Sequence, residues 1–246
     1  MLIHGIGHRW QGWTPVIERL QDQREVIALD LPGFGASRMP PPGTPPGIVS
    51  LTDLVSAFLD ELGLERPHVA GNSLGGWIAL ELAKRDRVRS ATGLSPAGFQ
   101  TRGESRFSHG SLWLARRASQ LIDGHTDRVL RSPAAVKLGF GQLSAHPERI
   151  PADALAGDVH ALATAPWFDA TLVAITNAAF TGGERITVPV RVAWGEHDRL
   201  LLPRQAERAR QAIPGAKVTV EPGWGHVPFH DDPGGVARVL LEASRG

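Results

Sequence analysis

The sequence predicts an α/β fold in which a mainly parallel sheet is covered by helices on both faces. Short apolar runs typical of strands alternate with helix-like stretches over residues 1–98 and again over residues 184–246. Between these parts, residues 99–183 show helix-like stretches separated by proline and glycine, without a strand pattern. We therefore expect a core formed by residues 1–98 and 184–246. We expect residues 99–183 to form an inserted helical cap over the carboxyl edge of the sheet, where such folds bind ligands.

The first part of the core contains alternating strand and helix patterns. Apolar residues recur at three- and four-residue spacing over residues 51–62, which is a helical period. Residues 37–47 hold five prolines and two glycines, a composition typical of a loop. In order, we expect a strand at 1–3, a helix at 13–20, a strand at 25–29, a helix at 51–62, a strand at 67–70, a helix at 77–84 and a strand at 88–94.

The same patterns predict the helices of the expected cap and the elements of the second part of the core. Within the expected cap, the helix-like stretches are residues 111–121, 127–130, 152–165 and 170–179. The alternation then resumes with a strand at 188–194, a helix at 203–213, a strand at 217–221 and a last helix at 234–243.

Composition excludes several classes of protein. The 26 basic and 25 acidic residues are nearly balanced, so nothing indicates a nucleic-acid partner. The absence of cysteine excludes disulfides and thiolate metal sites. No apolar run reaches the length of a membrane span, so we expect a cytoplasmic protein without a membrane partner, either a monomer or a homodimer.

A glycine-rich turn between the strand at 67–70 and the helix at 77–84 predicts a nucleophile. Residues 71–75 read Gly-Asn-Ser-Leu-Gly, which fits the G-x-S-x-G nucleophile elbow. Such a tight turn tolerates no bulk beside the serine, and glycine avoids the Cβ clash. The strand pattern before it and the helix pattern after it supply the expected context, so we predict that Ser73 is a catalytic nucleophile.

A serine hydroxyl needs an adjacent base, and the base needs an acid to orient it. Residues 195–198, Gly-Glu-His-Asp, follow the strand at 188–194 and offer two acids, Glu196 and Asp198. His226 lies in a glycine-rich loop after the strand at 217–221. Both loops leave the sheet at the same edge as the serine turn, so the three groups can converge.

Taken together, these motifs resemble those of the capped, single-domain α/β-hydrolase family, and the resemblance covers nearly the whole chain. This family includes esterases, lactonases, C–C bond hydrolases, epoxide hydrolases and haloalkane dehalogenases. The matching motifs lie at residues 4–7, 30–35, 71–76, 195–198 and 225–228.

The resemblance implies a role for each of five residues. Ser73 is the expected nucleophile, Asp198 the acid and His226 the base. The backbone N–H groups of Ile6 and Leu74 are expected to form the oxyanion hole. No cofactor and no metal ion are expected. His226 and His230 are four residues apart, but Pro228 between them argues against a helical metal site.

One feature departs from the family pattern. Members usually carry an antiparallel strand hairpin before the His-Gly loop, whereas only three residues precede His4 here. We therefore expect either that the chain lacks this N-terminal hairpin or that its start is placed too late, and we expect the strand at 25–29 to lie at a sheet edge.

Several further polar residues are expected to have structural roles. We expect Asp30 to stabilise a turn and His4 to hold the oxyanion loop by bonding its backbone. Glu196 and His197 are expected to face solvent, and Asp231 to cap the last helix.

The residue at the elbow limits the possible chemistry. In this family, dehalogenases and epoxide hydrolases need a carboxylate there, and epoxide hydrolases also use cap tyrosines, whereas this chain has Ser73 and no tyrosine. C–C bond hydrolases share Asn72 but usually place an aromatic residue where this chain has Val227. We expect them to need a buried arginine as well, and the pattern around Arg116 and Arg117 indicates a solvent-facing helix.

We therefore predict a serine hydrolase that cleaves carboxylic esters of small to medium apolar acyl groups through an acyl-enzyme. Trp113, Trp167 and Phe168 are the cap aromatics expected to influence substrate choice. Two alternatives remain. One is a C–C bond hydrolase of the meta-cleavage product type, acting on a ketone, and the other is a catalytically silent binding protein with a hydrolase fold.

Overall fold

The computed structural model describes residues 1–245 and confirms a parallel sheet, with six strands in the order β2-β1-β3-β4-β5-β6. Every pair of neighbouring strands within these residues is parallel. The strands are β1 (Leu2–Ile3), β2 (Ala28–Leu29), β3 (His68–Asn72), β4 (Ser90–Leu94), β5 (Val190–Gly195) and β6 (Lys217–Glu221). The chain runs outward from β1 to β2 and then returns to β3 on the other side of β1. Ligands of such sheets bind at the carboxyl ends of the strands beside this reversal.

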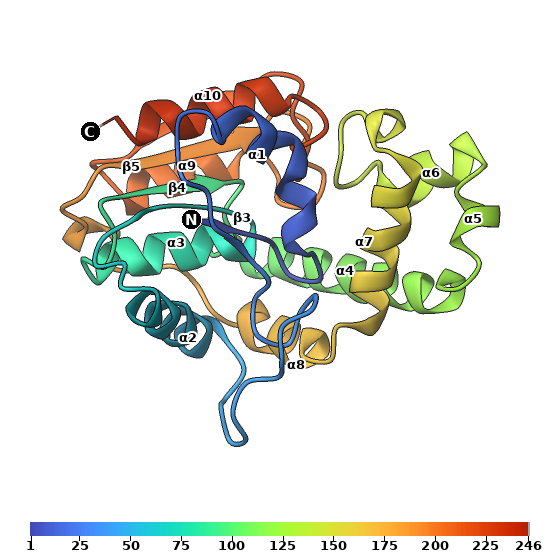
Figure 1. The fold of residues 1–246 in the computed structure, drawn as a ribbon, viewed down its shortest axis with the longest axis horizontal. Helices are drawn as coiled ribbons and strands as arrows, with labels where there is room; N and C mark the ends of the chain where they lie inside the picture. The colour runs from blue at the N-terminus through green and yellow to red at the C-terminus, as the bar shows by residue number, and fades with distance from the viewer. Residues whose placement is uncertain (246) are drawn as a thin grey trace.

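Helices cover both faces of the sheet, as Figure 1 shows. One face carries α1 (Thr14–Leu20) and α10 (Pro233–Ala243), and the other carries α2 (Ile48–Glu61), α3 (Leu74–Lys84) and α9 (Gln205–Ala212). Each face buries its own apolar cluster. Trp77 and Val192 belong to the cluster beneath α3, and Trp13 belongs to the one beneath α1 and α10.

Strand β2 forms one edge of the sheet, as expected from the sequence. It spans only Ala28–Leu29, whereas the apolar pattern predicted a strand over 25–29. A short edge strand exposes few unpaired backbone groups, which limits edge-to-edge association.

Between β4 and β5 the chain forms only helices and irregular segments. The α-helices are α4 (Arg102–Ile122), α5 (Thr126–Val129), α6 (Pro133–Phe140), α7 (Ala152–Thr164) and α8 (Phe168–Thr176). We call α4–α8 the inserted helices. Helices α4–α7 extend beyond the end of the sheet on the right of Figure 1. The 3-10 helices of the chain are η1 (Trp10–Trp13), η2 (Pro147–Arg149) and η3 (Gly183–Arg185).

Helix α4 begins at Arg102, nine residues before the start predicted from the hydrophobic pattern. A capping box explains the earlier start. The Thr101 hydroxyl accepts from the Glu104 N–H, and the Glu104 carboxylate accepts from the Thr101 N–H at 2.8 Å. Glu104 also pairs with Arg204 and Arg208, which ties the start of α4 to the region of α9.

No helix within residues 1–245 is both long and apolar enough to cross a membrane.

Glycine permits the close contact between α3 and the sheet, and this can be tested with a pair of variants. A Cβ atom at Gly75 would lie 2.3 Å from the carbonyl oxygen of Ile3, whereas one at Gly110 in α4 would meet no atom within 4 Å. We expect Gly75→Ala to lower the free energy of unfolding by about 3 kcal/mol or more. Gly110→Ala should raise it by about 1 kcal/mol, because alanine favours a helix interior. Urea unfolding measures both, and equal effects of the two substitutions would contradict the packing argument.

Candidate active site

Ser73 lies at the junction of β3 and α3 in a strained conformation. Its φ of 55° and ψ of −116° are rare for a residue with a Cβ atom. Its N–H donates to the carbonyl of Leu94, and its own carbonyl accepts from the N–H groups of Trp77 and Ala97. The glycines on both sides are needed, since a Cβ at Gly71 would lie 2.1 Å from the carbonyl oxygen of Gly75. The backbone therefore has the form expected of a nucleophile elbow.

Asp198 and His226 form a buried pair. The His226 Nδ1 lies 2.7 Å from Asp198 Oδ2, and both side chains are almost completely buried. The other carboxylate oxygen accepts from the N–H groups of Leu200 at 2.9 Å and Leu201 at 2.8 Å. Because the carboxylate can only accept, Nδ1 of the neutral imidazole carries the proton, and Nε2 is left as an acceptor.

Asn72 connects the histidine loop to the serine turn. Its amide Nδ2 donates to the carbonyl of His226 at 2.8 Å and to that of Leu94 at 3.1 Å. The backbone of His226 is thereby held beside the strand that ends at Ser73. The sequence indicated Asn72 only as a point of family likeness and did not reveal this contact.

Asp231 has a different role from the one predicted. The residue that caps α10 is Asp232, whose carboxylate accepts from the N–H of Gly235 at 2.8 Å. The buried Asp231 carboxylate instead accepts from the N–H of Gly225 at 2.7 Å, next to His226. It also accepts from Ser144, Ala145 and His146, between the inserted helices α6 and α7. Pro233 carried the signal that separates the two aspartates, because proline favours the first position of a helix and so places the cap at Asp232.

The loop at residues 4–7 is rigidly held, as predicted for His4. The His4 Nε2 accepts from the Leu31 N–H at 2.9 Å, and its Nδ1 donates to the carbonyl of Gly5 at 2.7 Å. Complete burial disfavours the charged ring and lowers the pKa of His4 to about 4. Asp30 also has its expected structural role, because its carboxylate accepts from the N–H groups of Trp10 and Ala36.

This loop lies directly against the serine. A Cβ at Gly5 would come 3.1 Å from Ser73 Cβ, and Ile6 and Ser73 line the same pocket. As the first residue of α3, Leu74 has an N–H group without an intrahelical partner. Both N–H groups named as oxyanion donors thus belong to segments that adjoin Ser73, and their role stays a prediction.

The two residues that follow this loop, His8 and Arg9, contact the inserted helix α7. Arg9 Nε lies 3.2 Å from Asp158 Oδ1, and His8 Nε2 lies 3.4 Å from Asp158 Oδ2. Burial opposes the charged form of His8, but the Asp158 carboxylate outweighs it and raises the pKa of His8 above its ordinary value. Burial likewise opposes ionisation of Asp158, yet His8 and Arg9 hold the pKa of its carboxyl below the usual value.

A small pocket lies above the serine, between the core and the inserted helices. Its volume is about 20 Å³, which is room for about one water molecule. The pocket is thus nearly closed in this conformation. From outside the inserted helices it is lined by Ile6, Ser73, Trp77, Ala97, Gln100, Leu200 and Leu201, and from the inserted helices by Ser105, Ser108, Leu112, Leu172, Ile175 and Thr176.

Comparison with known proteins identifies the family of the chain. Residues 1–239 match the family described as the alpha/beta hydrolase family. The chain belongs to this family. A relative named epoxide hydrolase EphH, from Mycobacterium tuberculosis, is 36% identical to this hydrolase over 196 residues, which are 77% of this chain and 91% of the relative.

Solved structures show the same fold. An esterase from Thermogutta terrifontis superposes with a TM-score of 0.73 at 22% identity, over 98% of this chain and 87% of the esterase. An enol-lactonase from Burkholderia xenovorans has a TM-score of 0.74 at 22% identity, over 98% of this chain and 89% of the lactonase.

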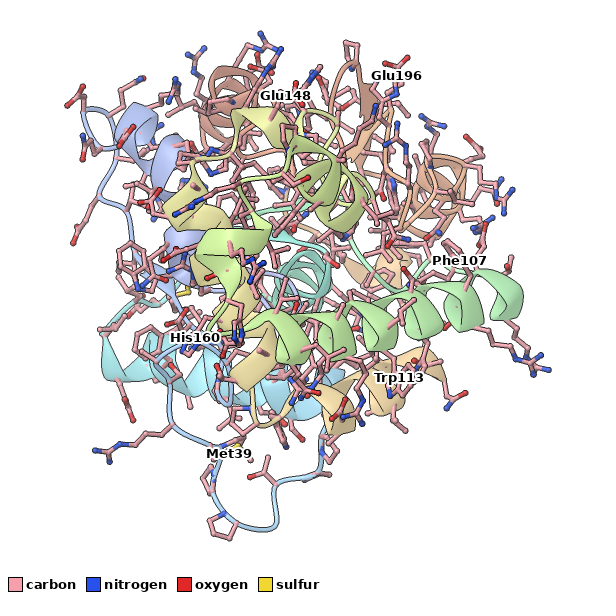
Figure 2. The ribbon with its side chains drawn as sticks, turned by 90° about the vertical axis from the view of Figure 1, so that its right-hand side faces the viewer. Met39, Phe107, Trp113, Glu148, His160 and Glu196 are labelled. Atoms are coloured by element: carbon pink, nitrogen blue, oxygen red, sulfur yellow. The ribbon has the colours of Figure 1, made fainter. Side chains whose placement is uncertain are left out.

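The aromatic residues singled out in the inserted segment do not line the pocket of this hydrolase. Trp113 lies on an exposed part of α4, and Figure 2, which looks onto the inserted helices, labels it beside that helix. Trp167 and Phe168 are buried in the core instead. The inserted helices instead contribute aliphatic and hydroxyl side chains to the pocket, which the sequence did not single out.

The expectation that Arg116 faces solvent is wrong, whereas it holds for Arg117. Arg116 is only 7% exposed, and its guanidinium donates to the carbonyl of Leu162 and lies over the ring of Phe168. The reason is that Arg116 lies four residues after Leu112, on the buried face of a helix longer than the pattern predicted.

The remaining acidic and histidine candidates lie at the surface. The side chains of Glu196 and His197 are about half exposed, and Figure 2 labels Glu196 at the molecular surface. Residues 1–245 contain no group of three or more histidine, aspartate or glutamate side chains that could hold a metal ion.

The lowered pKa of His4 predicts a pH-dependent stability. The unfolded chain binds this proton near pH 6.5 and the folded chain only near pH 4, so stability present above pH 6.5 is lost as the pH falls to 4. The loss should be roughly 3 kcal/mol. His4→Gln should flatten the dependence of unfolding free energy on pH in this range, relative to the native chain. Replacing the exposed His160 by glutamine is the control, and an equal flattening in both variants would contradict the assignment.

Proposed function

We propose that this hydrolase cleaves carboxylic esters through an acyl-enzyme, with Ser73 as nucleophile, His226 as base and Asp198 as the acid that orients it. The observation that carries the proposal is the buried Asp198–His226 bond of 2.7 Å, on loops that adjoin the strained turn at Ser73. In this proposal the Asp198–His226 pair activates the Ser73 hydroxyl as a nucleophile. A protein that only binds a ligand needs neither the pair nor the strained serine.

The steps follow from the free Nε2 atom of His226. As Ser73 Oγ attacks the ester carbonyl carbon, its proton passes to Nε2, and the Asp198 carboxylate stabilises the imidazolium. The tetrahedral intermediate collapses, the C–O bond to the alcohol breaks, and the alcohol leaves with that proton. A water molecule then gives a proton to Nε2 while it attacks the acyl carbon. The carboxylic acid is released and Ser73 regains its proton.

The N–H groups of Ile6 and Leu74 stabilise the negative oxygen of both tetrahedral intermediates in this proposal. Each donor is worth about 3 kcal/mol in the transition state when it is already in position. His4 supports this role because it holds the backbone of Gly5, next to Ile6.

We further propose that residues 99–183 act as a cap on a core of residues 1–98 and 184–246. Six pocket residues come from α4 and α8, so these helices limit the space above Ser73. The apolar walls and small volume favour small to medium acyl groups.

Epoxide hydrolysis is the second candidate, because the relative from Mycobacterium tuberculosis carries that name. Chemistry argues against it in this chain. Attack by a serine oxygen on an epoxide would leave an ether, which water cannot hydrolyse under these conditions, whereas attack on an ester leaves a hydrolysable acyl group. The chain also has no tyrosine to protonate the opening ring.

C–C bond hydrolysis is less favoured than ester hydrolysis for a different reason. The buried Arg116 is not among the pocket residues and is already bonded to the carbonyl of Leu162. No pocket-lining residue within residues 1–245 is basic, so the carboxylate of a dienoate-type substrate has no cation to pair with there.

The nucleophile can be tested by covalent labelling. We expect a fluorophosphonate to modify Ser73 in the native chain and aryl esters to be cleaved. Ser73→Ala and His226→Ala should abolish labelling and lower ester turnover by several orders of magnitude, because the members of a triad act as a unit. The control is Ser132→Ala, at an exposed serine just before α6, and this variant should be labelled normally. Labelling at another serine, or turnover of an aryl epoxide but of no ester, would overturn the proposal.

The identity of the acid can be tested by two isosteric amide substitutions. Asp198→Asn should lower kcat on the order of 10⁴-fold, since it favours the wrong tautomer of His226. Glu196→Gln should change kcat little, because Glu196 is half exposed and its carboxylate lies next to the Gly223 N–H and the exposed His197. Steady-state kinetics with one aryl ester compares the two variants. The reverse ranking would show that Glu196 is the acid.

A further inference from the structure

The pocket above Ser73 contains few polar hydrogens that a ligand could use. The Ser105 hydroxyl donates to the carbonyl of Thr176 at 2.6 Å, and the Ser108 hydroxyl donates to that of Ser105 at 3.1 Å. The Thr176 hydroxyl donates to the carbonyl of Leu172 at 2.6 Å. Trp77 Nε1 donates to Glu81 at 3.1 Å. These side chains line the pocket, but their hydrogens are already committed within the chain.

Among the pocket side chains, Gln100 is the exception apart from Ser73. Its Oε1 accepts from the N–H of Gly98 at 2.8 Å, while its amide Nε2 makes no hydrogen bond within residues 1–245. An amide nitrogen carries two N–H donors, so Gln100 keeps a donor pair for a ligand in an otherwise apolar pocket.

The surrounding backbone holds Gln100 in place. The Phe99 carbonyl accepts from Arg208 Nε at 2.6 Å, and the Thr101 N–H donates to the Glu104 carboxylate at 2.8 Å. Gly98, which positions the amide oxygen, is itself bonded through its carbonyl to the N–H of Phe180 at 2.9 Å. Contacts on both sides of Gln100 therefore reduce the entropy lost when its amide binds a ligand.

We infer that Gln100 determines specificity, and that its Nε2 donates to a second, neutral oxygen acceptor of an otherwise apolar ester substrate. This inference rests on the proposed ester hydrolysis at Ser73. A neutral acceptor such as a ketone or ether oxygen fits, because no basic side chain lines the pocket to balance a carboxylate. A purely alkyl ester shields the amide N–H groups from water and leaves them without a partner, which disfavours binding.

Matched substrates test the inference. The pairs are aryl 4-oxopentanoate with aryl 4-methylpentanoate, aryl 5-oxohexanoate with aryl 5-methylhexanoate, and 2-oxopropyl acetate with isobutyl acetate. Each pair exchanges a carbonyl for a branched carbon of similar size, on either the acyl or the alcohol side. The quantity measured is the ratio of kcat/KM for the oxo ester to kcat/KM for the alkyl ester.

We expect Gln100→Leu to lower this ratio about tenfold in at least one pair, through slower cleavage of the oxo ester. Gln100→Glu should lower it further, because a second acceptor then faces the substrate oxygen. Gln211→Leu, the same substitution at an exposed glutamine of α9, should leave the ratio unchanged. Gln100→Met keeps the side-chain length without an N–H and supplies the comparison if the leucine variant does not fold.

The outcomes separate this inference from the proposed function. If turnover depends on Ser73 but the ratio is the same in the native chain and the Gln100 variants for all three pairs, Gln100 does not bind the acceptor and only this inference fails. If Ser73→Ala cleaves the esters as fast as the native chain, the ester hydrolysis itself is wrong.

Discussion

The close packing of β1, β3 and the start of α3 is the constraint on which the site depends. A Cβ at Gly75 would lie 2.3 Å from the carbonyl oxygen of Ile3, and one at Gly71 would lie 2.1 Å from the carbonyl oxygen of Gly75. Glycine at these positions lets the helix begin within contact of the strands, so Ser73 is held at positive φ and the loop at residues 4–7 lies against it. The strain is maintained because hydrogen bonds on both sides of Ser73 hold the turn.

The positions of Asp198 and His226 depend on a second set of backbone contacts, between the loops after β5 and β6. The His197 N–H donates to the carbonyl of Trp224 at 2.8 Å, and a Cβ at Gly195 would lie 2.1 Å from the carbonyl oxygen of Gly225. The Val227 N–H donates to the carbonyl of Leu143 at 2.7 Å. The Asp231 carboxylate accepts from Gly225, in the loop of His226, and from Ser144, in the inserted segment. The loop of His226 is therefore held by the core and by the inserted segment together.

Local patterns explain what the sequence could predict. The alternation of strands and helices, the glycine-flanked Ser73 and the loops of Asp198 and His226 are all encoded within short segments, and the structure places those segments at one edge of the sheet. The sequence also contained a signal for the start of α4 that the hydrophobic pattern missed, because residues 101–104 contain the Thr-x-x-Glu signature of a capping box. The burial of Arg116, the bonds of Asp231 and the free amide of Gln100 depend on contacts between distant segments. A pattern within one segment carries no signal for them.

The ion pairs between the inserted helices and the core indicate how the pocket makes room for a substrate. Glu104 joins α4 to Arg204 and Arg208, and Asp158 joins α7 to the loop that contains Arg9. Breaking the pairings of a buried carboxylate costs about 3 kcal/mol or more. Moving an apolar side chain away from its preferred rotamer costs about 1 kcal/mol. Leu112, Leu172 and Ile175 from the inserted helices, with Leu200 and Leu201 from the core, supply such movable walls. Rotation of one or two of these side chains therefore enlarges the 20 Å³ space at a lower cost than separation of α4, which carries the buried Glu104, from the core. Selection among substrates, under the proposed ester hydrolysis, then depends on the shape of these aliphatic walls and on the polar groups that stay in place between them.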